Sequence, residues 1–241
     1  MSNNYFIFKQ FTIRHDRCAM KVGTDGTLLG AWAEVPSSVP HPSILDIGTG
    51  TGLIALMMAQ RFPQSIIKAI DIDREAVAQA KENIATSPFA DRIGTANIAI
   101  QDFCDSTFDA IVCNPPFFTE ALTCPDERRT AARHTSSLTY EELMIAAGRT
   151  LSDCGEISVI IPTDCMDSMN SAAAIVGLHP KRICYVKTTE RKPAKRVLLA
   201  YSRQHPGRDI ETRTMIIGDN EYKRLTDDFY LSPEEKASAN I

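Results

Sequence analysis

Residues 43–52 read SILDIGTGTG. The mostly apolar run from Ser43 to Ile47 predicts a buried strand, and a helix is expected from Leu53 to Arg61, where apolar residues occupy every side. Between strand and helix lie Gly48, Gly50 and Gly52, which permit positive φ angles and allow a ligand to approach the backbone. The stretch therefore predicts the first strand, ligand-binding loop and helix of an α/β sheet.

Strand-like and helix-like segments alternate along the rest of the chain. Further strands are expected at residues 65–70, 95–100, 108–113, 156–161, 183–187 and 196–201. Helices are expected at residues 25–34, 74–85, 140–151 and 164–177, with Asp73 as an N-cap and Thr139 opening a capping box. This pattern predicts an α/β fold with a doubly wound, mostly parallel, seven-stranded sheet. The last two strands predict a hairpin, which places one antiparallel strand near the C-terminus.

The 241 residues are interpreted as one domain. An N-terminal arm and helix occupy residues 1–42, the core occupies residues 43–205, and residues 206–241 form a C-terminal extension expected to pack on the core. The first residues contain no apolar signal-peptide core, and no apolar stretch approaches the length of a membrane span. We expect a monomer without membrane contact.

The net charge and the spacing of the cysteines limit the ligands and cross-links that the chain is expected to have. The formal net charge is −4, so nucleic-acid binding requires a local basic patch. The seven cysteines are scattered without a C-x2-C pair, which argues against a disulfide framework and against a metal site. Reduced thiols in a cytoplasmic protein are expected.

The glycine loop differs from the dinucleotide pattern G-x-G-x-x-G. From Gly48 the third glycine would fall at position 53, which is Leu53, and the acid Asp46 precedes the loop. An acid at the loop entrance opposes a pyrophosphate and suits a ligand that carries a positive amine or sulfonium. The loop therefore favours a different nucleoside ligand from NAD.

Two further acids end neighbouring strands. Asp71 ends the second strand, where a carboxylate accepts bonds from both ribose hydroxyls of NAD or S-adenosylmethionine alike. Asp102 and Phe103 follow the third strand, where an adenine is expected. Asp102 is predicted to accept from the adenine amino group, with a plain loop acid as the alternative. Phe103 is predicted to offer a backbone contact or a stacking face.

The tetrapeptide Asn114-Pro115-Pro116-Phe117 follows the strand at residues 108–113. Two prolines stop the strand and fix the backbone beyond it. The Asn114 amide oxygen and the Pro115 carbonyl are two acceptors, and together we expect them to accept both hydrogens of an NH2 group. Phe117 is expected to stack on a flat base. Taken alone, the tetrapeptide is equally consistent with a rigid turn.

Together these residues resemble the class I S-adenosylmethionine-dependent methyltransferases, which have a Rossmann-like fold, and the Asn-Pro-Pro-Phe segment resembles the branch that methylates amino groups. Phe11, the segment from Met20 to Trp32 and the closing Asp228-Phe229-Tyr230-Leu231 resemble the bacterial tRNA (adenine-N6)-methyltransferases. The resemblance implies S-adenosyl-L-methionine as cofactor and tRNA as partner, with transfer to the adenine 3′ to the anticodon of a valine tRNA. It also implies that Lys21, Gly23 and Thr24 lie beside the cofactor, although Thr24 or Asp25 can equally cap the helix that follows.

RNA contacts require positive charge, which gathers in two places. Arg128, Arg129 and Arg133 follow the proline segment. Between residues 187 and 208 seven basic residues oppose one acid, and the candidates for RNA contact there are Arg191, Lys192, Lys195 and Arg196. A solvated face without RNA contact is the alternative for this run.

Four rival functions remain. Protein glutamine N5-methylation presents the same NH2 group, but only about 45 residues precede the glycine loop, too few for the helical domain expected there. DNA adenine methylation lacks room for a target-recognition domain. A NAD-dependent oxidoreductase requires the glycine pattern that is absent, and a catalytically silent S-adenosylmethionine-binding module has no need of Asn114 to Phe117.

Overall fold

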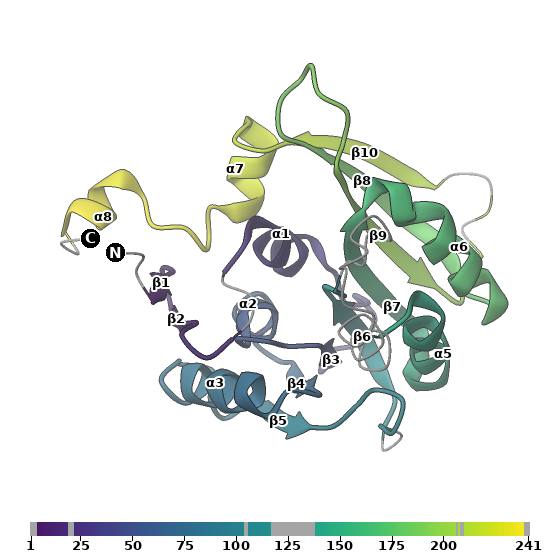
Figure 1. The fold of residues 1–241 in the computed structure, drawn as a ribbon, viewed down its shortest axis with the longest axis horizontal. Helices are drawn as coiled ribbons and strands as arrows, with labels where there is room; N and C mark the ends of the chain where they lie inside the picture. The colour runs from purple at the N-terminus through teal and green to yellow at the C-terminus, as the bar shows by residue number, and fades with distance from the viewer. Residues whose placement is uncertain are drawn as a thin grey trace, which may run out of the picture.

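The computed structural model describes residues 4–18, 22–103, 106–116, 138–205, 207 and 210–238. Within them, a sheet of eight strands runs in the order β10-β8-β9-β7-β6-β3-β4-β5 (Figure 1). The strands are β3 (Ser43–Ile47), β4 (Ile66–Asp71), β5 (Ile93–Asn97), β6 (Phe108–Cys113), β7 (Leu151–Pro162), β8 (His179–Lys187), β9 (Arg196–Ser202) and β10 (Glu211–Ile216).

The predicted fold class is confirmed, and the number of strands is corrected. Only β9 among the described strands of this sheet runs against its neighbours, pairing antiparallel with β7 and β8, as the predicted hairpin requires. The sheet has eight strands instead of seven because β10, from the C-terminal extension, pairs parallel with β8. In β10 only Met215 is buried, so this strand lacks the apolar run that marked the others.

Helices cover both faces of the sheet (Figure 1). One face packs against α1 (Thr24–Trp32), α2 (Leu53–Arg61) and α3 (Arg74–Ala85), and the other against α5 (Tyr140–Thr150) and α6 (Met166–Ile175), which follows the short helix η1 (Thr163–Cys165). Alternating residues of β3 pack into the two hydrophobic clusters on opposite faces of the sheet. Ile44 belongs to the cluster under α1, α2 and α3, and Leu45 to the cluster under α5 and α6. Both residues are fully buried, which explains why β3 is mostly apolar.

Helix caps follow the sequence in two cases and differ in a third. The Asp73 carboxylate accepts from the amide of Glu75 at 2.9 Å, and Thr139 and Glu142 form the expected capping box. The expected cap of α1 by Thr24 or Asp25 is wrong, since Gly23 is the N-cap and no side chain bonds there. Asp25 instead pairs with Arg196 at 2.8 Å.

The N-terminal arm is held by the C-terminal extension. Strands β1 (Tyr5–Ile7) and β2 (Thr12–Arg14) form a small antiparallel sheet, and the extension also contains α7 (Asn220–Thr226) and α8 (Pro233–Ser238). Phe8 forms a bridge with Tyr230, and the amide of Lys9 donates to the Phe229 carbonyl at 2.8 Å. No helix among the described residues is both long and apolar enough to cross a membrane.

Candidate functional site

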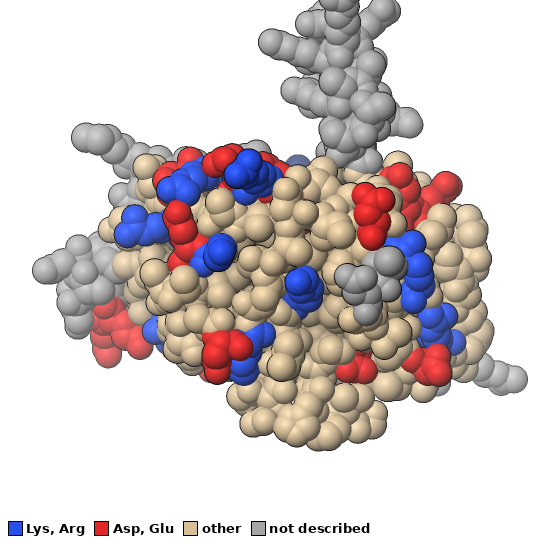
Figure 2. All heavy atoms as spheres, turned by 90° about the horizontal axis from the view of Figure 1, so that it is seen from below, with Lys and Arg blue, Asp and Glu red and all other residues tan. Residues whose placement is uncertain are grey.

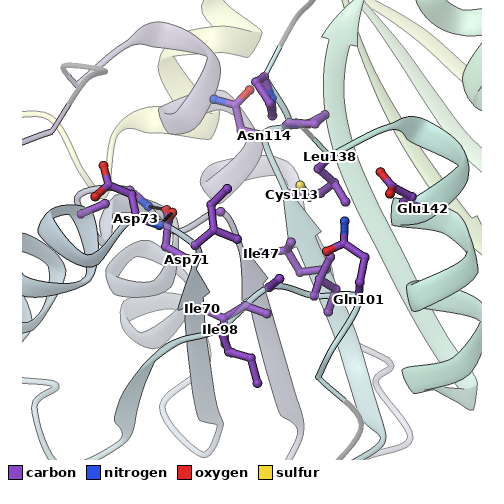
Figure 3. Close-up of a pocket in the computed structure, with 18 of the residues that line it drawn as sticks. Ile47, Ile70, Asp71, Asp73, Ile98, Gln101, Cys113, Asn114, Leu138 and Glu142 are labelled. Carbon is purple, nitrogen blue, oxygen red and sulfur yellow. Dashed lines mark hydrogen bonds between the residues drawn. The ribbon is translucent and has the colours of Figure 1, made fainter. Parts of the chain in front are cut away.

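A cavity of about 550 Å³ opens at the carboxyl ends of β3, β4 and β6 (Figure 3). In an open α/β sheet this edge is where ligands bind. Asp71 and Asp73 lie on one side of the cavity, Gln101 and Glu142 on the other, and Asn114 lies above them. The cavity therefore gathers residues from segments that are far apart in the sequence.

The glycine loop forms one wall of this cavity. Gly48 and Gly50 line it with φ angles of +68° and +56°, which other residues rarely adopt. The amides of Gly48 and Thr49 both donate to the Ile70 carbonyl, at 2.9 and 3.0 Å. Gly52 is not a lining residue in the described part of the chain; it is the left-handed N-cap of α2. These bonds fix the loop against the end of β4.

Asp46 lies behind the glycine loop and is fully buried. Its Oδ2 accepts from the Thr49 hydroxyl at 2.6 Å and from the Ala55 amide at 3.2 Å. Burial raises the pKa of this carboxyl from 3.8 to about 7. The sequence suggested an acid that meets the ligand's positive charge, whereas the side chain connects the loop to the first turn of α2.

Asp71 ends β4 and lines the cavity. Its Oδ2 accepts from the Gly50 amide and its Oδ1 from the Asp73 amide, both at 2.9 Å. Each carboxylate oxygen retains acceptor capacity after one such bond. The side-chain amide of Asn97 donates to the carbonyls of Asp71 and Ile72, at 3.0 and 2.9 Å, and so holds the turn that presents the acid. Asp71 is thus suited to accept from two neighbouring hydroxyl groups.

The segment from Ile98 to Asp102 forms the far end of the cavity. Ile72, which is 56% exposed, and Ile98 give it apolar surfaces, and Asp102 supplies an acid. Phe103 differs from expectation because its ring is buried and packs against Phe108, with centroids 5.9 Å apart. Phe103 does not line the cavity in the described part of the chain, so the predicted stacking face is not there.

Asn114 lies just beyond the end of β6, where it lines the cavity with Pro115 and Pro116. Its Oδ1 is buried and accepts no hydrogen bond from any residue that the structure describes. An unpaired buried acceptor costs about 1–3 kcal/mol and points to a donor that arrives with a ligand. Phe117 lies outside the described residues.

Several cavity residues carried no functional signal in the sequence. They are Cys18 from the arm, Ile98 after β5, and Leu138 and Glu142 at the start of α5. The capping box located Glu142 at a helix start but gave no reason to place it at the cavity. Gly23 and Thr24 do not line the cavity in the part that the structure describes, and Lys21 lies outside it.

The arm is nevertheless tied to the glycine loop by the buried amide of Asn83 in α3. Its Oδ1 accepts from the Arg14 amide, and its Nδ2 donates to the carbonyls of Arg14 and Thr51, each at 2.9 Å. Every hydrogen of this side-chain amide is therefore used. The same residue fixes the loop and the arm segment that leads to Cys18.

The basic run at residues 187–208 divides into two parts. Arg191, Lys192 and Lys195 are exposed in the loop between β8 and β9, at the sheet edge that carries the cavity. Arg203 lies beyond the other end of β9 and donates to the carbonyls of Gly148 and Leu151. The face in Figure 2 mixes acidic with basic side chains. Arg128, Arg129 and Arg133 lie outside the described residues.

The described residues contain no group of three or more His, Cys, Asp or Glu side chains that could hold a metal ion. The described lining of the cavity consists of carboxylates, the amides of Gln101 and Asn114, the thiols of Cys18 and Cys113, the Thr139 hydroxyl, backbone groups and apolar side chains.

Comparisons with known proteins agree with this geometry. The family model of the methyltransferase small domain matches residues 33–169. The chain is 49% identical to a tRNA1(Val) (adenine(37)-N6)-methyltransferase of Phocaeicola vulgatus, over 96% of this chain and 100% of the relative. An enzyme of the same name from Bacteroides thetaiotaomicron is 46% identical over 96% and 99%.

Solved structures share the fold at low sequence identity. A predicted O-methyltransferase of Agrobacterium tumefaciens aligns with a TM-score of 0.60 at 16% identity, covering 90% of this chain and 96% of its own. A methyltransferase of Pyrococcus furiosus aligns with a TM-score of 0.51 at 20% identity, covering 68% and 76%.

Proposed function

Because the chain belongs to the family of the tRNA1(Val) (adenine(37)-N6)-methyltransferases, we propose that it transfers a methyl group from S-adenosyl-L-methionine to N6 of adenine 37 in a valine tRNA. The observation that carries the proposal is the unpaired, buried Oδ1 of Asn114, a residue that lines the cavity of about 550 Å³. Such an acceptor requires an N–H or O–H donor, and an exocyclic amino group supplies one.

The residues of the cavity fit the cofactor. Asp71 would accept from the two ribose hydroxyls, the backbone of Gly48 and Gly50 would lie against the ligand, and Asp102 would accept from the adenine amino group. Asp46 and Gly52 would act through the loop they hold, and Lys21, Gly23 and Thr24 would approach from the arm. When bound, the cofactor supplies a methyl group on a positively charged sulfur, which is an excellent leaving group.

The protein has to prepare a poor nucleophile. The lone pair of an exocyclic adenine nitrogen is delocalised into the ring, so the site must oppose that delocalisation. Asn114 Oδ1 and the Pro115 carbonyl would each accept one N6 hydrogen. These two bonds would turn the nitrogen toward tetrahedral geometry and point its lone pair at the methyl group. Pro115 and Pro116 hold these acceptors in place, and fixed orientation is the main catalytic demand.

The reaction is balanced without a strong general base. The nitrogen lone pair forms the new N–C bond, the electron pair of the breaking S–C bond stays on sulfur, and the methylated nitrogen then releases one proton to solvent. Phe117 would stack on the target base, which must leave its own stack to enter the cavity. This cost is small in an anticodon loop because the base there is unpaired.

We place the arm, the core and the extension, residues 1–42, 43–205 and 206–241, in one methyltransferase domain that acts as a monomer. Its tRNA contacts would come from Arg191, Lys192, Lys195 and Arg196, with Arg128, Arg129 and Arg133 beside the proline segment.

The proposal is tested with radiolabelled S-adenosylmethionine and total tRNA from cells that lack this modification. Nuclease digestion and mass spectrometry then locate the label. Label on N6-methyladenosine at position 37 of a valine tRNA is the expected result. Label on protein glutamine in a parallel lysate reaction, with none on tRNA, would replace the proposal with the glutamine rival.

Neutralising Lys192 and Lys195 together, as K192Q/K195Q, should weaken tRNA binding about tenfold near 0.1 M salt, because two phosphate contacts are lost. The slope of log affinity against log salt should fall by about 1.5. Filter binding measures both quantities, while calorimetry should show unchanged affinity for S-adenosylhomocysteine. The exposed Lys81 on α3, changed to glutamine, is the matched control. An equal loss of affinity for tRNA and for S-adenosylhomocysteine would mean that the loop between β8 and β9 has a structural role instead.

A further inference from the structure

Arg149 reaches from the last turn of α5 to the end of the cavity where Asp102 lies. Its Nη2 donates to the carbonyls of Ile100 at 3.0 Å, Gln101 at 3.2 Å and Phe103 at 2.8 Å. These three carbonyls belong to the segment between β5 and β6, whose residues from Ile98 to Asp102 line the cavity. One guanidinium nitrogen therefore bonds to the backbone of the turn from Ile100 to Phe103.

The segment has few bonds of its own. Outside the strands, the Asp102 amide donates to the Ala99 carbonyl at 3.1 Å, and the Phe103 amide donates to the Ile100 carbonyl at 3.3 Å. Three carbonyl dipoles that point toward one place repel each other unless a donor lies between them. A charged donor forms bonds about twice as strong as a neutral one, so Arg149 is the strongest hydrogen-bond donor to this turn in the described part of the chain.

The position of Asp102 follows from this restraint. Its neighbours on both sides, Gln101 and Phe103, give their carbonyls to Arg149, while its own side chain is exposed to the cavity. The Phe103 ring anchors the far end of the turn in the core. The Ile100 side chain is buried in the same core, so without the guanidinium the turn stays anchored at Ile100 and Phe103. The carbonyls on either side of Asp102 lose their donor, and this frees the Asp102 carboxylate to move.

We propose that Arg149 is a positioning residue that sets the selectivity of the cavity for an adenine ring. The inference rests on the proposed function, in which Asp102 accepts from the adenine amino group. A hypoxanthine ring carries a carbonyl oxygen at that position, and this oxygen faces the fixed carboxylate as a second acceptor. A carboxylate free to turn away tolerates either group, so discrimination depends on the guanidinium.

Arg92 supplies a matched control. Its guanidinium also donates to three backbone carbonyls, those of Ala59 at 2.8 Å, Ser65 at 3.1 Å and Phe62 at 3.2 Å. It lies at the end of α2, and none of these residues lines the cavity in the described part of the chain. Arg92→Met therefore removes the same chemistry without touching the proposed adenine site.

The test compares calorimetric dissociation constants for S-adenosylhomocysteine and S-inosylhomocysteine. We expect the wild type and Arg92→Met to prefer the adenine compound at least tenfold, and Arg149→Met to reduce the preference to threefold or less. Arg149→Lys, which retains a donor, should fall between them. Hydrogen exchange of the ligand-free protein should show the Asp102 and Phe103 amides exchanging at least tenfold faster in Arg149→Met.

An undiminished preference in folded Arg149→Met, or an equal loss in Arg92→Met, would overturn the inference. The Arg149 side chain is exposed, so its replacement spares the core. If Arg149→Met nevertheless fails to fold, Arg149→Lys decides the question. An intermediate preference for the adenine compound in Arg149→Lys supports the inference, and a full wild-type preference refutes it. A wild type that binds neither compound while folded would refute the proposed function itself, which separates the two failures.

Discussion

Replacing Asn114 with alanine is expected to lower the single-turnover rate of methyl transfer to tRNA by about 100- to 1000-fold. This is the loss seen when one preorganised group that stabilises a transition state is removed. The Asn114 oxygen has no partner among the described residues, so its truncation strands no donor in the free protein. Affinity for S-adenosylhomocysteine and for tRNA should stay within about threefold of the wild type, since most contacts with both ligands lie elsewhere.

Rapid-quench kinetics with saturating ligands measures the rate, and calorimetry and filter binding measure the two affinities. Asn170→Ala is the matched control: Asn170 lies on α6, and its Oδ1 accepts from the Tyr201 hydroxyl at 2.8 Å. That variant should lose stability and keep the rate. If Asn114→Ala bound both ligands and turned over normally, the acceptor role of Asn114 would be wrong.

Apolar patterning predicted the elements whose stability comes from their own side chains. Strand β3 and helix α2 lie where the buried runs place them, and the caps at Asp73 and Thr139 follow from local hydrogen bonding. Strand β10 escaped prediction because its stability comes from backbone pairing with β8. A polar edge strand has no sequence period that separates it from a loop.

The site was predictable only where a motif marks the chemistry. Gly48, Asp71 and Asn114 belong to motifs, and the fold brings all three to one cavity. Glu142 joins them through helix packing, which no local pattern reveals. Arg149 is equally hidden, because a basic residue in the last turn of a helix is usual there for the helix dipole alone.

The stability of the ligand-free protein should depend on pH through Asp46. Burial raises the pKa of this carboxyl from 3.8 to about 7, so the folded protein holds a proton that the unfolded chain releases. The stabilisation is fully present below pH 3.8 and is lost as pH rises through about 7. The loss amounts to roughly 1.4 kcal/mol per pH unit across this window, or about 4 kcal/mol in all.

Urea unfolding of the wild type and Asp46→Asn across this pH range isolates the effect from other titrating groups. Asparagine keeps a neutral acceptor for the Thr49 hydroxyl and the Ala55 amide, so its stability relative to the wild type should rise by about 4 kcal/mol from pH 4 to pH 7. Thr49→Val should extend the upper end of the window to higher pH, because the Thr49 hydrogen bond lowers the pKa of Asp46 in the folded protein. Parallel curves for the wild type and Asp46→Asn would contradict the raised pKa and mean that Asp46 is already ionised in the folded protein.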